Sequence, residues 1–529
     1  MFRYSPLILV VAMLLPGTAR AADGAATEEA AFDLLEFAVD GNTVLPAVTV
    51  EGAVYPFLGP GRDFKAIESA RAALEKAYQD RGYLSASVLI PEQRIAGGVV
   101  RLQVMEGSVE RLKVSGNRYT SRGDIRDQVP AVAAGAVPHF PALQEQLAGL
   151  NRGAERQVTP LLRPGHVPGK LEVELAVEDQ LPLQANLELN NRQSPDTTAT
   201  RLEAGVRYNN LFQRQHSLGL NYVVSPQKPA EVSVFLASYQ WPLDRTRGIS
   251  LSLQHSNSNI GAAADNVVVG KGTTLSARLS RQLPPVPGAP TLFHSLALGF
   301  DFKDLRETQN ILGADSKVTP LRYLPLVGQY TAGSVSEAGD LLGNLSMIAG
   351  LRVFAREVNC QGIPLDQFDC RRYGSREDFS ALRGDLSYTR RQLGWELGLR
   401  GDFQASHSAL VSPEQFLGGG ADSVRGYYEG EAAGDYGLRL RGEVKTPSLY
   451  ADDATTVRAV AFLEGAWLRL KDALPGQTSR FNLGGAGLGL RLAAGKWGQV
   501  SVDVGHALRP GPKTDRGDLR AHARLRANF

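Results

Sequence analysis

Cysteine and histidine are scarce in this chain of 529 residues, which contains two Cys and eight scattered His. Two cysteines exclude a disulfide-dense scaffold and a zinc ribbon. The chain also lacks a phosphate-binding GxxxxGK[ST] motif, an HExxH motif and a GxSxG motif. We therefore expect no enzymatic activity, no metal site and no cofactor.

One glycine-rich run, residues 484–489, superficially resembles a nucleotide-binding loop. Its glycine spacing does not fit such a loop, and it lies within a segment of alternating apolar and polar residues. We therefore expect these glycines to permit close packing between neighbouring strands.

An excess of either charge is also absent from the chain. Lys and Arg together number 57, Asp and Glu together number 55, and the net charge is +2. This balance argues against nucleic acid as a partner, although a local charged patch is compatible with it.

The only long apolar run is at the amino terminus, where residues 1–22 match a signal peptide. Arg3 is followed by the apolar residues 6–15 and by Ala19-Arg20-Ala21, a small-x-small cleavage pattern. This run is shorter than the ~20 residues that a helical membrane anchor needs. We expect an exported protein with a short leader at 23–32, and any residence in a membrane then requires a β-barrel.

Two consecutive α+β units are predicted at residues 33–108 and 109–180. Apolar residues recur with helical spacing at 64–80 and 140–151, and short alternating segments flank both helices. An internal repeat is indicated by a Gly-Asn pair after the first strand of each unit. These pairs are Gly41-Asn42 and Gly116-Asn117.

Helical periodicity disappears over residues 181–529, where short segments alternate between apolar and polar residues. In the last segment, apolar residues from Leu519 to Phe529 alternate with a row of mostly basic residues. A soluble sandwich can alternate in this way, but an aligned basic row favours a transmembrane β-barrel with a wet lumen. We count about sixteen strands, with fourteen as the alternative. The predicted centres are residues 187, 204, 220, 236, 252, 275, 298, 324, 348, 384, 398, 441, 462, 488, 502 and 524.

The loop at residues 415–430 lies between the eleventh and twelfth predicted strands and combines many glycines with three aromatic rings. Such a loop is either mobile at the surface or docked at a specific place. Another long loop, between the ninth and tenth strands, contains Cys360 and Cys370. In an exported protein these neighbours are expected to form a disulfide that braces an extracellular loop. Their spacing and the lack of a nearby His disfavour a metal site.

The first α+β unit contains a series of short motifs in a fixed order. They are Val39-Asp40-Gly41-Asn42-Thr43, Tyr78-Gln79-Asp80-Arg81-Gly82-Tyr83, Ile90-Pro91-Glu92-Gln93 and Val104-Met105-Glu106-Gly107. This series resembles the POTRA domain of two-partner secretion transporters. The resemblance implies a periplasmic module that docks an incoming polypeptide, which the exposed edge of a small sheet can do by β-augmentation.

Val424-Arg425-Gly426-Tyr427 resembles the signature of the inward-folded loop in a superfamily of outer-membrane barrels. The resemblance implies that Arg425 pairs with an acidic residue on the lumenal wall of the thirteenth strand. Phe462 and Glu464 share that face, and Glu464 stands where the family usually has Asp. We expect this pair to lock the loop inside the barrel. The terminal Phe529 resembles the carboxy-terminal signal of outer-membrane barrels.

The best fit is the haemolysin secretion/activation family, the ShlB/FhaC/HecB-type transporters of two-partner secretion. The resemblance implies a barrel in the Gram-negative outer membrane, with periplasmic POTRA modules that bind an exoprotein and pass it to the cell surface without nucleotide hydrolysis. The implied partners are a large β-helical exoprotein, outer-membrane lipid and, during biogenesis, the barrel-assembly machinery and periplasmic chaperones. Nucleic acid is not among them.

Two alternatives remain. An insertase for other barrels would usually carry more POTRA modules or a different set. A passive porin would leave both periplasmic units without a role. Some family members also carry an amino-terminal helix that plugs the pore, and we expect none here because the leader is short.

Overall fold

The computed structural model describes residues 31–529 except 152, 154, 259, 264, 265, 270, 290, 310–316, 355 and 361. The expected signal peptide and nearly all of the leader lie outside the described residues. The same is true of the segment in which we expected no plug helix. The chain forms two compact units. One runs to Asn117 and continues over Ile125–Asp179, and the other comprises Arg118–Asp124 and Gln180–Phe529.

The first α+β module comprises β1 (Phe32–Leu34), β2 (Glu36–Asp40), α1 (Ala47–Val54), η1 (Tyr55–Phe57), β3 (Gly59–Arg62), α2 (Phe64–Asp80), β4 (Ser87–Leu89) and β5 (Val99–Met105). Its main sheet has the order β2-β5-β4, with β2 parallel and β4 antiparallel to β5. Helix α2 begins after Asp63, whose carboxylate accepts a hydrogen bond from the backbone N–H of Ala66. It ends before Gly82, which has a φ of +86°.

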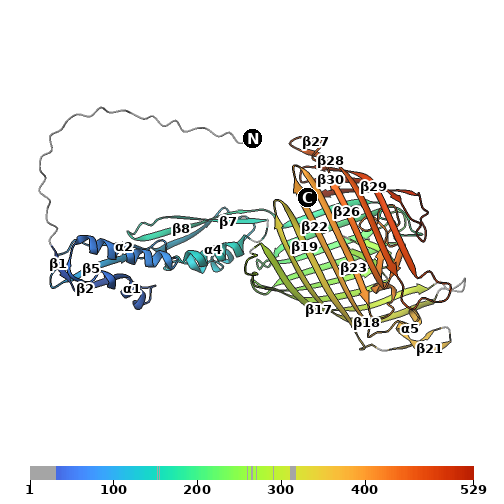
Figure 1. Ribbon diagram of the computed structural model, residues 1–529, viewed down its shortest axis with the longest axis horizontal. Coiled ribbons are helices and arrows are strands. Elements are labelled where there is room, and N and C mark those ends of the chain that lie inside the picture. The colour runs from blue at the N-terminus through green and yellow to red at the C-terminus, as the bar shows by residue number, and fades with distance from the viewer. Residues whose placement is uncertain are drawn as a thin grey trace. The chain divides into compact units, whose positions relative to one another are not determined.

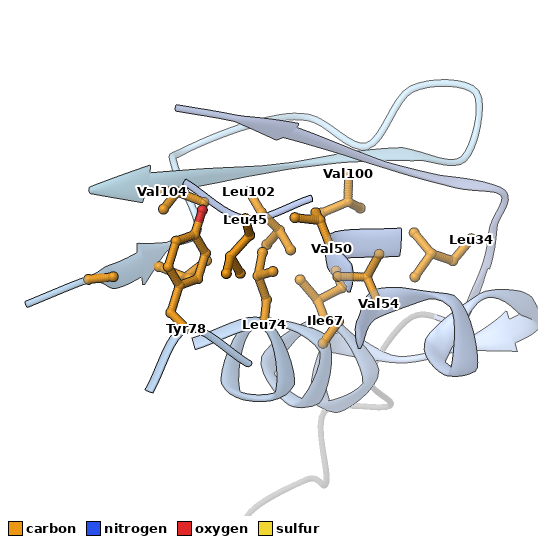
Figure 2. Packing of buried hydrophobic residues seen from close by; sticks show 13 residues of the cluster. Leu34, Leu45, Val50, Val54, Ile67, Leu74, Tyr78, Val100, Leu102 and Val104 are labelled. Carbon is orange, nitrogen blue, oxygen red and sulfur yellow. The ribbon is translucent and has the colours of Figure 1, made fainter. Parts of the chain in front are cut away.

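The core of this module lies between α2 and the central strand β5 (Figure 2). Ile67, Leu74 and Tyr78 of the helix point toward alternate residues of β5, which are Val100, Leu102 and Val104. The helical spacing of α2 and the alternation of β5 therefore place their apolar side chains at one interface. Helix α1 also contributes Val50 and Val54 to this core, although its short sequence did not predict a helix.

The second module comprises β6 (Ser108–Ser115), α3 (Arg122–Asp127), η2 (Pro130–Val132), α4 (Phe140–Leu150), β7 (Arg156–Pro164) and β8 (Lys170–Asp179), with sheet order β6-β8-β7. The Gly-Asn repeat has a physical basis. Gly41 and Gly116 have φ values of +87° and +81°. A Cβ at either position would lie 2.4 Å from a strand carbonyl, that of Val104 or Val177. Both glycines therefore permit the same tight exit from the first strand.

The second unit is a closed antiparallel barrel, and its described residues contain sixteen wall strands (Figure 1). Each expected strand centre falls within one of them, and the short β27 (Tyr450–Ala451) lies in a turn. The wall strands are β9 (Leu183–Asn190), β10 (Arg201–Leu211), β11 (His216–Val224), β12 (Ser233–Pro242), β13 (Arg247–Ser256), β16 (Gly272–Gln282), β17 (Leu292–Gln309), β18 (Lys317–Ser336), β19 (Gly339–Leu351), β22 (Ser380–Gln392), β23 (Trp395–Ser406), β26 (Tyr436–Lys445), β28 (Thr455–Arg469), β29 (Arg480–Ala494), β30 (Gly498–Ala507) and β31 (Leu519–Asn528).

The barrel closes where β31 pairs with β9, from Arg524 opposite Asn190 to Asn528 opposite Asn186. The side chain of Asn191 extends this seam. Its Nδ2 donates to the carbonyl of Ala521, and its Oδ1 accepts from the N–H of Ala523, each over 2.8 Å. The seam therefore joins segments more than 300 residues apart in the chain.

The two faces of the wall differ as the alternation predicts. Leu463 on β28 is 64% exposed on the outer face, whereas its neighbours Phe462 and Glu464 are buried in the interior. Such a wall suits lipid outside and a polar lumen inside. Among the helices that the structure describes, none combines the length and hydropathy of a membrane-spanning segment.

Long loops join the strands at one end of the barrel and short turns at the other. The turn at Leu393-Gly394 is short, whereas residues 352–379 and 407–435 form long connections. β27 (Tyr450–Ala451) and α5 (Gln367–Arg371) mark the opposite ends (Figure 1). The hairpins β14 (Ile260–Ala263) with β15 (Asn266–Val269), β20 (Glu357–Cys360) with β21 (Ile363–Asp366), and β24 (Phe416–Gly418) with β25 (Ala432–Gly434) lie within the long connections.

Candidate functional site in the barrel lumen

The connection between β23 and β26 folds into the barrel. It contains η3 (Ser412–Glu414) and the β24–β25 hairpin, and residues 419–431 form the tip. Val424 and Tyr427 at the tip are fully buried, and Arg425 is 4% exposed. The loop at 415–430 is therefore docked, and the alternative of a mobile surface loop is not what the structure shows.

Arg425 and Glu464 are in direct contact. The Nε and Nη2 of Arg425 donate to Glu464 Oε1 over 3.0 and 2.7 Å. The backbone N–H of Arg425 donates to Glu464 Oε2 over 2.6 Å. Both carboxylate oxygens are thus used, and the longer Glu side chain spans the gap where the family pattern has Asp.

Two further carboxylates and an aromatic ring complete the surroundings of Arg425. Its Nη2 donates to Glu443 over 2.9 Å, and its Nη1 lies 3.2 Å from Asp503. Its guanidinium carbon lies 3.5 Å from the centre of the Phe462 ring. A buried cation is costly unless its donors are satisfied, and here three strands supply acceptors. Phe462 and Glu464 are predicted from the sequence. Glu443 and Asp503 were not predicted, although they also occupy lumen-facing positions of their strands.

Glycines of the wall make room for the loop backbone. A Cβ at Gly485 would lie 2.2 Å from the carbonyl oxygen of Arg425, and one at Gly505 would lie 2.5 Å from the nitrogen of Gly426. The run at 484–489 was expected to serve close packing between strands. That holds for Gly487, whose Cβ would meet the Val504 carbonyl at 2.0 Å, but Gly485 accommodates the docked loop instead.

The other motif residues also contact the wall. Val424 packs in an apolar cluster with Ala466, Leu483 and Ala507. The N–H of Gly426 donates to His522 Nε2 over 3.1 Å. The hydroxyl of Tyr427 lies 2.6 Å from the carbonyl of Arg509 and 3.0 Å from that of Gly484. Each of the four signature residues thus has a partner on the wall or in a neighbouring loop.

Two acidic residues that the sequence did not predict as site residues attach the tip to other long loops. Glu429 accepts a hydrogen bond from Arg192 over 3.2 Å. Glu431 accepts bonds from the backbone N–H groups of Lys513 and Thr514, each over 2.8 Å, and from the Thr514 hydroxyl over 2.6 Å. Their only sequence signal was the alternation of acidic and small residues after the motif, which does not identify partners.

Asp435 is the last residue of the connection between β23 and β26 and is fully buried. It anchors this end of the docked loop. Arg372 binds its two carboxylate oxygens over 2.5 and 2.6 Å. The backbone N–H groups of Leu410 and Lys471 donate to the same carboxylate over 3.0 and 2.7 Å. One aspartate therefore connects three long loops.

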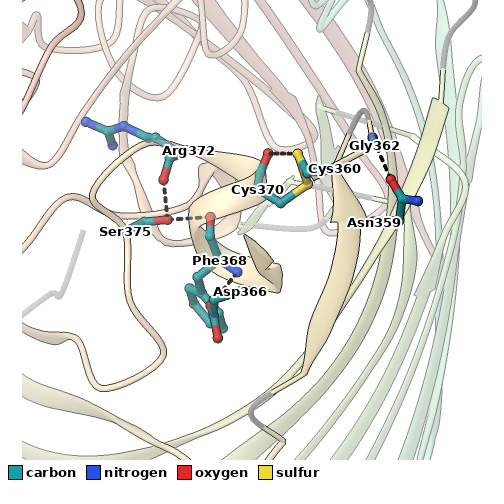
Figure 3. Close-up of a disulfide and its surroundings, with 8 residues drawn as sticks. All are labelled: Asn359, Cys360, Gly362, Asp366, Phe368, Cys370, Arg372 and Ser375. Carbon is teal, nitrogen blue, oxygen red and sulfur yellow. Dashed lines mark hydrogen bonds between the residues drawn. A yellow bond between two sulfur atoms is a disulfide. The ribbon is translucent and has the colours of Figure 1, made fainter. Parts of the chain in front are cut away.

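Cys360 and Cys370 form a disulfide between β20 and α5, as Figure 3 shows. Helix α5 begins after Asp366, whose carboxylate accepts a hydrogen bond from the N–H of Phe368. Phe368 is buried in a cluster with Tyr323 and other apolar residues of β17, β18, β19 and the neighbouring loops. The disulfide-bonded segment is therefore seated on the wall.

Phe529 lies at the outer face of the barrel and is 69% exposed. Its backbone N–H and carbonyl both bond to Ala185 of β9, over 2.8 and 3.2 Å. Its role as an assembly signal stays a prediction.

In the described part of the chain, no group of three or more His, Cys, Asp and Glu side chains is placed to hold a metal ion.

Comparisons with known proteins identify the architecture. Residues 169–492 match the family model described as haemolysin secretion/activation protein ShlB/FhaC/HecB. Residues 32–107 match the POTRA domain of ShlB type. The chain is 24% identical over 490 residues to the outer membrane transporter CdiB of Escherichia coli, with 89% of this chain and 78% of the relative covered.

Solved structures share the fold. CdiB from Escherichia coli matches with a TM-score of 0.60 and 21% identity, covering 96% of this chain and 93% of that one. BamA from Haemophilus ducreyi lacking POTRA domains 1–3 matches with a TM-score of 0.55 and 14% identity, covering 94% of this chain and all of that one. Barrel fold alone therefore does not separate transporter from insertase, whereas the two family models do.

Proposed function

Since the chain belongs to the haemolysin secretion/activation family of outer-membrane two-partner secretion transporters, we propose that its first POTRA module captures an extended segment of an exoprotein. The barrel then passes this exoprotein through the lumen to the cell surface. The observation that carries the proposal is an apolar groove beside an unpaired strand edge in the first module.

The groove lies between α2 and the edge strand β4 and has a volume of about 600 Å³. Phe64 and Leu89 are each 52% exposed there, and Ile95 is 38% exposed. Because β4 ends its sheet, no strand covers its outer edge. Only α2 side chains reach it: the N–H of Val88 donates to Glu75 over 3.4 Å, and its carbonyl accepts from Arg71 over 3.5 Å. These two long bonds would yield to the backbone of an incoming strand. An extended cargo segment could therefore add a strand and place alternate apolar side chains in the groove.

The Pro91-Glu92-Gln93 segment defines the end of this edge. β4 stops at Leu89, and the side chain of Gln93 then takes over the pairing with β5. Its amide bonds the carbonyl and the N–H of Arg101 over 2.8 and 2.7 Å. The Gln93 side chain therefore takes the backbone hydrogen bonds of β5 beyond the end of β4. The outer strand edge of the sheet on this side is thus confined to β4.

The test replaces Leu89 by Lys in the full-length protein. Leu84→Lys is the matched control, because Leu84 is a similarly exposed leucine of the same module that does not line the groove. We expect Leu89→Lys to reduce the exoprotein in the medium at least several-fold, with unchanged amounts of folded barrel in the outer membrane. Equal secretion by both variants would contradict capture at this groove.

Deletion of the protein separates transport from barrel assembly. A transporter predicts loss of one or two exoproteins from the surface and medium, with other barrels intact. A general fall in outer-membrane barrels would instead support an insertase. The neighbouring gene is expected to encode the exoprotein, and we expect that protein to be large and β-helical.

No catalytic step is part of this function. The driving force in our proposal is folding of the exoprotein once it emerges, since nucleotide is not expected in the periplasm. We therefore expect the secretion rate to depend on the folding stability of the part of the exoprotein that has reached the cell surface.

We also propose that periplasmic chaperones deliver this barrel to the outer membrane and that the barrel-assembly machinery inserts it.

A further inference from the structure

We infer that a cationic pocket in the lumen, next to the tip of the docked loop, binds carboxylate side chains of the polypeptide in transit. This inference rests on the proposed transport function and adds a binding site on the path. The pocket has a volume of about 230 Å³ and is lined by the loop tip and by residues of β9, β26, β29, β30 and β31.

Cations outnumber anions in this pocket. Its lining includes six Arg and Lys side chains against three Asp and Glu, and the cations are Arg192, Arg425, Arg441, Lys445, Arg491 and Arg524. Four of these cations are already paired. Arg425 and Arg192 hold the loop, Arg491 binds Asp503 over 2.7 and 2.9 Å, and Lys445 binds Glu396 over 2.8 Å.

The remaining two, Arg441 and Arg524, supply the binding capacity. Within the residues that the structure describes, neither guanidinium has a carboxylate at ion-pair distance. The Nε of Arg441 is shielded from solvent and has no hydrogen-bond partner. Arg524 stands between Ser501 and Asn190 in the ladder, and neither neighbour carries a charge. Asp422 is close enough to interact electrostatically with both arginines but contacts neither. Two guanidiniums beside a cavity with no carboxylate in contact are suited to a further carboxylate, which accepts two parallel N–H bonds from one guanidinium.

The loop itself shows that a carboxylate fits this place. Asp422, which lines the pocket, binds Arg192 over 2.5 Å, yet its side chain remains 51% exposed. Arg192 is also bonded to Glu429, so the loop contributes two acidic groups to one arginine. An acidic side chain of the cargo entering the pocket would meet Arg441 and Arg524 and would compete with Asp422 for Arg192. Occupancy would thus weaken one attachment of the loop tip.

The test measures binding of a labelled peptide to the purified full-length protein in detergent. The probe is an extended peptide with Asp or Glu at every second position, and a peptide with Asn and Gln at those positions is the comparison. The variant is Arg441→Gln with Arg524→Gln. Arg207→Gln is the control, because Arg207 lies on the lumenal face of β10 and does not line the pocket. Heat-modifiable mobility in gels checks that each barrel is folded.

We expect the acidic peptide to bind the wild type and the Arg207→Gln control equally, and to bind the double variant about tenfold or more weakly. The neutral peptide should bind weakly to all three. Equal binding of both peptides by the wild type, or an unchanged affinity of the double variant, would overturn the inference. Inorganic phosphate that binds alone, with the same loss in the double variant, and displaces the peptide completely would assign the pocket to a free anion and overturn the polypeptide assignment.

Secretion measurements separate this inference from the proposed function. Loss of peptide binding with normal secretion would remove the pocket from the transport path while leaving the function intact. Normal peptide binding by a protein whose deletion leaves every exoprotein secreted would overturn the function instead.

Discussion

At the scale of single residues, the site depends on one arginine with three carboxylate neighbours. Arg425 is predictable from the sequence because its motif resembles a known signature, and Glu464 is predictable from strand alternation. Glu443 and Asp503 are not, because their proximity depends on the stagger between β26, β28 and β30. Alternation identifies the face of a strand but not the height at which neighbouring side chains meet.

Glu464→Ala is expected to release the tip of the loop. It removes both oxygens that bind Arg425 and leaves a buried cation with fewer partners, a change that costs about 3–5 kcal/mol in buried pairs. Trypsin should then cut after Arg425, which is protected in the wild type by burial. Glu203→Ala is the control, because Glu203 is also a buried lumenal glutamate but bonds to Asn221 on the wall. Protection of Arg425 and normal secretion in Glu464→Ala would contradict the locking role.

Tyr78 in the first POTRA module is expected to titrate late. Burial raises the pKa of its hydroxyl above the ordinary value near 10, and the nearby carboxylate of Glu106, 3.2 Å away, raises the pKa further. The folded module therefore holds this proton more tightly than the unfolded chain. The resulting stability is complete below about pH 10 and is lost as the pH rises through the folded-state pKa.

The matching variant is Tyr78→Phe, which removes the hydroxyl's bonds to Asn42 and Glu106. We expect a loss of about 1 kcal/mol of module stability near neutral pH. The alkaline absorbance titration should lose one late phenolate relative to the wild type. A difference spectrum that titrates at the ordinary pH of tyrosine would show that burial does not perturb this group.

At the scale of elements, the sequence predicted the long periodic segments and missed the short ones. Sixteen strand centres and helices α2 and α4 follow from apolar spacing sustained over many residues. Helices α1 and α3 and the hairpins in the long connections are too short to show a period. They form because tertiary contacts cover them, as Val50 and Val54 of α1 are covered by the core of the first module.

The disulfide-bonded segment is expected to be held in place by Arg372 and Asp435. Arg372→Ala would leave the fully buried carboxylate of Asp435 with its two backbone donors and a long bond from the Gln415 amide, and with no cation. Residues 352–379 should then become sensitive to protease added to intact cells. Arg376→Ala is the control, because Arg376 pairs with Asp378 at an exposed position, where an ion pair contributes little. The same cleavage pattern in both variants would exclude the anchoring role.

At the scale of the whole molecule, the architecture was predictable because barrel alternation and POTRA motifs occupy separate parts of the chain. The docking of the loop was predictable only through the resemblance. Composition made docking and mobility equally acceptable, since glycines serve both. Burial of the tip follows from contacts with strands and loops far away in the chain, such as those of Gly426 with His522 and of Glu429 with Arg192, which are 96 and 237 residues apart.

Phe529 gives a prediction about biogenesis. If it is an assembly signal, Phe529→Ala should lower the amount of folded barrel in the outer membrane several-fold, with unfolded chain in the periplasm. Leu525→Ala removes an exposed apolar side chain from the same face of β31 and is the control. Heat-modifiable mobility measures the folded fraction. Equal levels of both variants would assign Phe529 an ordinary lipid-facing role.

The seam between β9 and β31 has a consequence for synthesis. Its bonds, including those of Asn191 to Ala521 and Ala523, join positions 330 and 332 residues apart. Until β31 has been translated and exported, β9 has no partner on one side, and the growing sheet has two free edges that can pair with other chains. A premature stop codon close to residue 519 would therefore remove little mass and yet leave the cell with an open, aggregation-prone sheet.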